Sequence, residues 1–178
     1  MGNVACSSQK NKSLLMIGLD QSGKTSILKE FFSQKDKLQS FKEDQTTHVL
    51  RLKDLELTIY DVSGDERTRQ YWQNYSQTAD MVVFVVDCTD QARIYLAKQE
   101  LERILGFEEL EDLPLLILSN KQDLKGMGRE EITKTLEIEQ ITNRSWSLTE
   151  TSIVDKRGLK DSLSWIRNSF TKRRGANK

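Results

Sequence analysis

The segment GLDQSGKT, residues 18–25, has the residue types that bind a chain of phosphates. It matches the pattern G-x-x-x-x-G-K-[ST], follows a short apolar run and opens an amphipathic segment. Backbone N–H groups of such a loop curl around a phosphate, and the following helix adds partial positive charge. The Lys24 ammonium would reach the β- and γ-phosphates, and the Thr25 hydroxyl would ligate Mg²⁺. The predicted phosphate-binding residues are Gly18, Leu19, Asp20, Gln21, Ser22, Gly23, Lys24, Thr25 and Ser26.

The segment NKQD, residues 120–123, would select the base. The Asp123 carboxylate only accepts hydrogen bonds. Guanine offers it two donors, N1–H and the 2-amino group, whereas adenine offers a lone pair at N1. A buried polar group left without its partner costs about 1–3 kcal/mol, so this site favours guanine. The stem of Lys121 would cover the base, and Asn120 would tie this loop to the phosphate loop.

Two further segments would complete the site. The segment DVSG fits D-x-x-G: Asp61 would hold a water bound to Mg²⁺, and the Gly64 N–H would approach the γ-phosphate. A loop of this kind changes when the γ-phosphate leaves. The segment ETS would end a later strand, so that the backbone N–H of Ser152 or Ile153 meets the guanine O6.

The elements that position these segments follow from hydrophobic patterning. Buried strands are predicted at SLLMIG, MVVFVVD and LPLLILSN, a hairpin at HVLRL and LELTIYDV, and a strand around residues 146–151. Helices are predicted at KTSILKEFF and around residues 91–106, 130–136 and 159–170. This alternation predicts an α/β fold, a six-stranded, mostly parallel sheet with one antiparallel hairpin strand and helices on both faces. Each motif then falls at the carboxyl edge of the sheet, where such folds bind ligands.

Composition excludes several classes of protein. The 178 residues fit one domain, and 27 basic residues balance 27 acidic ones. A neutral chain is a poor partner for nucleic acid, whose backbone needs a basic surface. No apolar run approaches the roughly 20 residues of a membrane span, and the N-terminus lacks a secretory signal. The two cysteines, Cys6 and Cys88, form no disulfide framework, which favours a reducing cytosol.

The combined segments GLDQSGKTSIL, YDVSG, YWQNY, VVFVVDCTD, LILSNKQDL and GLKDSLSWI resemble the Arf-like (ADP-ribosylation-factor-like) small GTPases of the Ras superfamily. The resemblance covers about residues 13–170. It implies the G domain of a P-loop NTPase that switches between GTP and GDP with Mg²⁺, in membrane traffic or signalling. It also implies an exchange factor, a GTPase-activating protein, effectors that read the GTP form through two switch segments, and attachment to a membrane through the N-terminus.

Two features depart from this family pattern, and one set of aromatic residues matches it. The first switch segment, EDQTTHVLRL, lacks the family's Pro-Thr-x-Gly, so either Thr46 or Thr47 would ligate Mg²⁺ in the GTP state. In the second, Tyr60, Trp72 and Tyr75 match aromatic residues that contact effectors; the alternative is that they belong to the core. Asp65 stands where the family has a glutamine.

The Asp65 substitution predicts slow hydrolysis of GTP. The family's glutamine orients the attacking water with an amide that both donates and accepts, whereas an ionised aspartate only accepts and adds negative charge beside the γ-phosphate. Losing such a contact typically costs 10²–10³ in rate. Glu66 or His48 would be the substitute for this role. The alternatives to a switch are a GTP-binding scaffold without useful turnover and a P-loop kinase; the chain has no arginine-rich lid segment for the latter.

The N-terminus is predicted to carry lipid. It begins with Met-Gly, so Gly2 is a candidate for myristoylation, although Cys6 stands where the motif has Ser or Thr. Cys6 is itself a candidate for palmitoylation, and two chains anchor stably where one is marginal. The alternative is an unmodified polar tail. We expect a flexible tail at residues 1–12, a G domain at 13–171 and a basic tail at 172–178. A lipid-bearing chain would be cytoplasmic and peripheral on a membrane.

Overall fold

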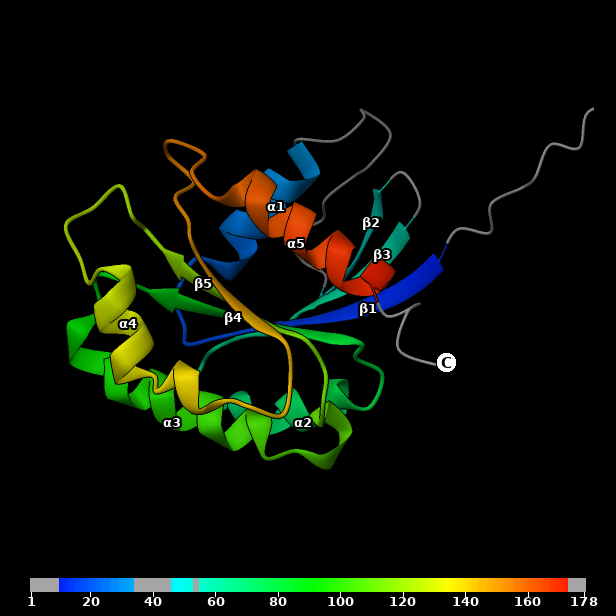
Figure 1. Ribbon diagram of the computed structural model, residues 1–178, viewed down its shortest axis with the longest axis horizontal. Helices are drawn as coiled ribbons and strands as arrows, with labels where there is room; N and C mark the ends of the chain where they lie inside the picture. The colour runs from blue at the N-terminus through cyan, green and yellow to red at the C-terminus, as the bar shows by residue number, and fades with distance from the viewer. Residues whose placement is uncertain (1–9, 34–45, 53–54, 173–178) are drawn as a thin grey trace, which may run out of the picture.

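The computed structural model describes residues 10–33, 46–52 and 55–172, which form a six-stranded sheet between two layers of helices (Figure 1). The strand order is β2-β3-β1-β4-β5-β6, and only the β2–β3 pair is antiparallel. The predicted fold class is confirmed. The strands are β1 (Lys10–Ile17), β2 (Thr47–Leu52), β3 (Leu55–Asp61), β4 (Met81–Asp87), β5 (Leu115–Asn120) and β6 (Trp146–Glu150).

Five α-helices of the described residues cover the sheet: α1 (Lys24–Ser33), α2 (Trp72–Ser76), α3 (Ile94–Leu105), α4 (Arg129–Thr135) and α5 (Leu159–Lys172). Helices α1 and α5 lie on one face, and α2, α3 and α4 lie on the other (Figure 1). The segment before α3 forms a 3-10 turn, Gln91–Arg93, capped by the Asp90 carboxylate. The predicted helix over residues 91–106 is therefore divided. Helix α2 had no predicted counterpart.

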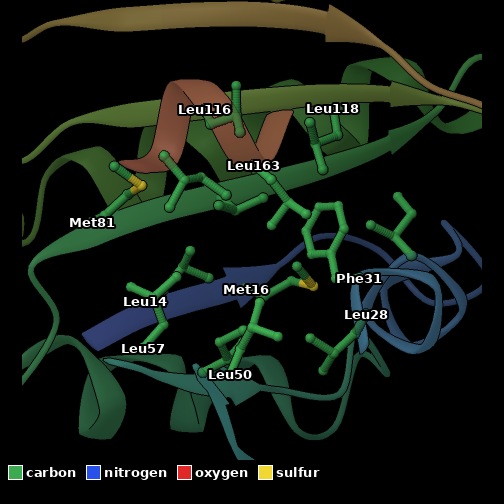
Figure 2. Close-up of a cluster of buried hydrophobic side chains, with 14 of the residues drawn as sticks. Leu14, Met16, Leu28, Phe31, Leu50, Leu57, Met81, Leu116, Leu118 and Leu163 are labelled. Carbon is green, nitrogen blue, oxygen red and sulfur yellow. The ribbon is translucent and has the colours of Figure 1, made fainter. Parts of the chain in front are cut away.

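The apolar core follows from the alternation of side chains along β1. Successive residues of a strand point to opposite faces. Leu14 and Met16 pack with α1 and α5, whereas Leu15 and Ile17 pack with α2, α3 and α4. Figure 2 shows the first layer, where Phe31 and Leu28 of α1 meet Met16 of β1. Because β1 is buried on both faces, its position is fixed, and so is the loop that follows it.

Strand β1 begins at Lys10, three residues before its expected start at Ser13. Lys10 pairs with Leu55 of β3, and its Nζ donates to the Phe170 carbonyl at 3.3 Å. Lys12 forms an ion pair with Asp80 at 2.6 Å. Residues 10–12 therefore belong to the sheet, which corrects the boundary of the N-terminal tail. The hairpin turn predicted at residues 53–54, the lipid-bearing residues Gly2 and Cys6, and residues 173–178 lie outside the described residues.

Candidate functional site

The loop between β1 and α1 brings the motif of residues 18–25 to the carboxyl edge of the sheet. Gly23 has a φ of 92°, and a Cβ there would lie 2.3 Å from Asn120 Nδ2. Only glycine combines this backbone conformation with such a close approach. The Asn120 Nδ2 donates to the Ser22 carbonyl at 2.9 Å. This contact is the tie between the phosphate loop and the base-selecting loop that the sequence predicted.

Lys24 is buried beneath the phosphate loop. Its Nζ donates to the Gly18 carbonyl at 3.0 Å and to the Leu19 carbonyl at 2.9 Å. Burial lowers the pKa of Lys24 to about 8, and the nearby carboxylates of Asp61 and Asp20 only partly offset this. A buried ammonium held by neutral carbonyls is poorly compensated, so an anion beside it would be strongly favoured.

Thr25 and Asp61 form a polar cluster next to Lys24, at the end of the phosphate loop. The Thr25 hydroxyl donates to Asp61 Oδ2 at 2.7 Å. The other oxygen, Asp61 Oδ1, is buried and accepts no hydrogen bond from the described residues. Mg²⁺ binds proteins through one or two hard oxygen ligands and the phosphates of a substrate. A hydroxyl beside an unsatisfied carboxylate oxygen therefore fits Mg²⁺.

The base-selecting end of the site is built by β5 and β6. Asn120 ends β5, and its Oδ1 accepts a hydrogen bond from the buried Thr151 hydroxyl at 3.2 Å. Lys121 lies in the left-handed region, with a φ of 68°, and its Nζ forms an ion pair with Asp87 of β4 at 2.6 Å. The loop after β5 is thus held by the strands on both sides of it.

Ser152 fixes the carboxylate that would read guanine. Its hydroxyl donates to Asp123 Oδ1 at 2.7 Å and accepts the backbone N–H groups of Val154 and Asp155 at 3.2 and 3.4 Å. The sequence predicted only a backbone contact for Ser152. The hydroxyl in addition joins the loop after β6 to the loop after β5.

One cavity of about 470 Å³ connects the two ends of the site. This volume falls in the range of pockets that bind small molecules and cofactors. The predicted residues that line it are Gln21, Gly23, Lys24, Thr25, Ser26, Asn120, Lys121, Asp123 and Ile153. The cavity is also lined by Leu124 and Val154, which are 55 % and 79 % exposed and had not been predicted. A leucine directly after NKQD was the available signal for Leu124; none pointed to Val154.

The D-x-x-G loop lies directly against the phosphate loop. The Asp20 N–H donates to the Gly64 carbonyl at 3.2 Å. A Cβ on Gly64 would lie 2.2 Å from the Gly18 carbonyl oxygen and 2.4 Å from Asp20 N. No other residue fits at this position without moving one of the loops.

Asp65 is engaged by its own turn. Its Oδ1 accepts the Arg67 N–H at 3.0 Å and the Arg67 Nε–H at 3.3 Å, and the first of these lowers the pKa of the carboxyl. Asp65 is not among the residues that line the cavity. Neither are the proposed substitutes Glu66, which is exposed, and His48, which is buried on β2 beside the Phe32 ring.

The aromatic residues of the second switch segment separate into two groups. Trp72 is fully buried; its Nε1 donates to the Ser63 carbonyl at 2.9 Å, and the Arg103 guanidinium lies over its ring at 5.5 Å. The expected effector contact through Trp72 is therefore wrong, because packing against α3 leaves it no surface. Tyr60 and Tyr75 are half-buried with ring centroids 5.6 Å apart, and Tyr71, which the sequence analysis missed, is 52 % exposed.

Thr46 precedes β2, and Thr47 is its first residue. Both are exposed; the Thr46 carbonyl accepts the Asp61 N–H at 2.8 Å, and Thr47 begins β2 opposite Tyr60. Neither lines the cavity.

Comparison with known proteins decides the family. The sequence model of the ADP-ribosylation factor family matches residues 2–170. The chain belongs to this family. It is 38 % identical over 161 residues to ADP-ribosylation factor-like protein 2 of Dictyostelium discoideum, which covers 89 % of this chain and 88 % of that relative. It is 35 % identical over 176 residues to ADP-ribosylation factor-like protein 1 of Saccharomyces cerevisiae, covering 93 % and 95 %.

A solved relative agrees with the fold of this Arf-like chain. The Arl6 (BBS3) small GTPase from Trypanosoma brucei, solved with the nucleotide analogue GppNp, superposes with a TM-score of 0.79. The match covers 92 % of this chain and 99 % of that one at 24 % identity. The chain is thus an Arf-like small GTPase, a GTP-binding switch of a family typical of membrane traffic. None of the helices among the described residues is both long and apolar enough to cross a membrane.

Proposed function

We propose that this Arf-like GTPase binds GTP and GDP with Mg²⁺ and hydrolyses GTP slowly by itself. The observation that carries the proposal is the Asp65 carboxylate, which stands in the place of the family's glutamine and accepts two hydrogen bonds from Arg67. An ionised carboxylate has no proton to donate, so it cannot hold a water as an amide does. Its charge also opposes the negative charge that gathers on the γ-phosphate during attack.

The proposed roles of the remaining residues follow from their contacts. The phosphate loop would cradle the phosphates, with Lys24 exchanging its carbonyl partners for phosphate oxygens. Thr25 would ligate Mg²⁺ and Asp61 would hold it through a water, and the ion would neutralise charge on the phosphates. Asp123 would accept from guanine N1–H and the 2-amino group, with Ser152 or Ile153 donating to O6. Thr46 or Thr47 would join the Mg²⁺ site in the GTP state.

Partners would complete the cycle. A GTPase-activating protein would supply the missing catalytic group in trans, as such proteins do with an arginine. An exchange factor would release GDP, and effectors would read the two switch segments. The aromatic residues with surface for an effector are Tyr60, Tyr75 and Tyr71, whereas Trp72 is excluded by its burial.

Single-turnover hydrolysis of bound GTP by the purified protein tests the proposal. We expect the unmodified chain to be slow and Asp65→Gln to be faster by on the order of 10², because the amide restores an orienting contact. Asp65→Asn is the matched control: it removes the charge but keeps the short side chain, so we expect a smaller gain. Rapid hydrolysis by the unmodified chain would contradict the proposal.

The same residue supports a second candidate, a GTP-binding scaffold without useful turnover. Asp65 weakens hydrolysis in both cases, and the cavity retains the contacts for binding. The two differ in the response to a partner. An activating protein accelerates a switch, whereas a scaffold keeps its GTP with every partner.

Membrane attachment is the last part of the proposal. Myristate on Gly2 and palmitate on Cys6 would place the protein on a cytoplasmic membrane surface, since two chains anchor stably. Without acylation the tail would remain in solution.

A further inference from the structure

Arg69 is a buried cation that the proposed roles do not use. Only 8 % of its side chain is exposed. It follows the D-x-x-G loop by five residues and is brought back over that loop by a turn in which the Asp65 carbonyl accepts the N–H groups of Thr68 and Arg69. Burying a guanidinium is costly unless it is paired and hydrogen-bonded. Its partners therefore indicate what it holds.

The strongest contact of Arg69 is with Gly64. Its Nε donates to the Gly64 carbonyl at 2.8 Å. The same carbonyl accepts the Asp20 N–H from the phosphate loop. The Gly64 carbonyl oxygen thus accepts two hydrogen bonds, one from the phosphate loop and one from Arg69. Together they hold Gly64 next to the phosphate loop.

The two carboxylates near Arg69 come from different elements. Asp20 of the phosphate loop lies 3.5 Å from Arg69 and 2.8 Å from Arg93. Glu100 of α3 lies 3.4 Å from Arg69 and 2.9 Å from Arg103. Arg69 therefore joins the D-x-x-G loop, the phosphate loop and α3. Helix α3 packs on the sheet through Ala97, Leu101 and Ile104, so it provides a rigid base for this contact.

We propose that Arg69 is a positioning residue that holds Gly64 at the phosphate loop and thereby sets the preference of this protein for GTP over GDP. The inference rests on the proposed function, in which the Gly64 N–H meets the γ-phosphate. A donor held in place before binding loses little freedom when the phosphate arrives. GDP has no γ-phosphate, so its affinity depends little on where Gly64 lies.

The experiment measures the dissociation constants of GDP and of a non-hydrolysable GTP analogue with Mg²⁺ for full-length Arg69→Gln and Arg69→Lys. We expect the GTP-analogue constant to rise at least tenfold and the GDP constant to change less than about twofold. Both variants lose the Nε donor to Gly64, so Arg69→Lys should not restore the preference. The control is Arg51→Gln, which removes an arginine paired with Glu56 at the opposite end of β3 and should leave both constants unchanged.

Several outcomes would overturn the inference. If both nucleotides lose affinity equally and the melting temperature falls, Arg69 has a purely structural role. If Arg69→Lys keeps the full preference for GTP over GDP, the Nε contact with Gly64 is not the cause of that preference. If Arg69→Gln does not fold, Glu100→Gln loosens the base of the contact and should shift the ratio of the two constants about twofold to fivefold in the same direction. An unchanged ratio there would also count against the inference. Failure of the unmodified chain to bind either nucleotide would instead contradict the proposed function.

Discussion

At the scale of single residues, Lys24 is a buried cation with weak compensation, as expected of a site that awaits an anion. The ammonium is buried with two carbonyl partners, and its pKa is lowered to about 8 by that burial. Asp61 keeps one buried oxygen without a hydrogen bond from the described residues. Both groups would gain a partner when a phosphate chain and Mg²⁺ bind. Sites of this kind concentrate perturbed pKa values because function, not stability, selects them.

The Lys24 pKa predicts a proton linked to nucleotide binding. Phosphate beside the ammonium raises its pKa above the free-state value of about 8. Binding therefore takes up a proton at about pH 8.5 and above, and affinity falls as pH rises through that value. Calorimetry of GDP binding in buffers of different ionisation enthalpy measures this uptake. At about pH 7 Lys24 is protonated in both states, so no uptake is expected there. Equal enthalpies in all buffers at about pH 8.5 would contradict the assignment.

Ser152 provides a second prediction at this scale. Ser152→Ala removes the donor to Asp123 and the acceptor for two backbone N–H groups. We expect GDP affinity to fall about tenfold, because a hydrogen bond to a charged group is lost. Fluorescent-GDP displacement measures the change. The matched control is Ser164→Ala, on the exposed side of α5, where the serine hydroxyl donates to the Lys160 carbonyl. An unchanged affinity in Ser152→Ala would show that Asp123 needs no support.

At the scale of elements, the second switch segment depends on α3. The buried side chains Arg69 and Trp72 both reach that helix, one through Glu100 and one through Arg103. The short helix α2 contributes the half-buried Tyr75, which packs beside Tyr60 of β3. The segment is thus anchored at its start and middle, and Tyr71 remains outside as a surface residue.

The burial of Trp72 predicts a loss of stability rather than of partner binding. Trp72→Ala should lower the free energy of unfolding by about 3–5 kcal/mol, because it leaves a large cavity under α2. Tyr71→Ala, one residue away and exposed, should change it by less than about 0.5 kcal/mol. Urea unfolding at a fixed GDP concentration compares the two. A stable Trp72→Ala that loses only effector binding would contradict the burial.

At the scale of the whole molecule, Lys10 and the phosphate loop lie at opposite ends of β1. Lys10 begins the strand and Ile17 ends it beside the phosphate loop, so the two ends are about 23 Å apart at the usual rise per residue. Lys10 and Lys12 are tied to Phe170 and Asp80 at the far end. The described chain therefore enters the sheet at the end opposite to the phosphate loop.

Lipid attachment at the N-terminus predicts that the full chain binds membranes. Protein made in a eukaryotic host should carry an acyl group on Gly2 by mass spectrometry and float with anionic vesicles. Gly2→Ala should abolish flotation, and Cys6→Ser should weaken it, because one chain alone binds marginally. Ser8→Ala is the control that should keep both properties. An unmodified Gly2 in that host would refute the anchor.

The buried strands of the sheet and the positions of the motifs were predictable from the sequence. Strands buried on both faces appear as continuous apolar runs, so β1, β4 and β5 were found with their motifs at the correct edge. The start of β1 was missed because Lys10, Asn11 and Lys12 are polar at the margin of the sheet. Helix α2 was missed because its five residues are too few to give a helical period.

The sequence by itself predicted a phosphate loop, a guanine-reading segment and a carboxylate at the position expected for a glutamine, because each depends on residue types a few positions apart. Only the tertiary structure decided that Trp72 is buried, that Ser152 holds Asp123, and that Arg69 joins Gly64 to Asp20 and Glu100. These groups are distant along the chain or ambiguous in polarity. Their contacts form only when α3 and the loops pack on a common sheet, because a buried charge is costly unless it is paired with an opposite charge.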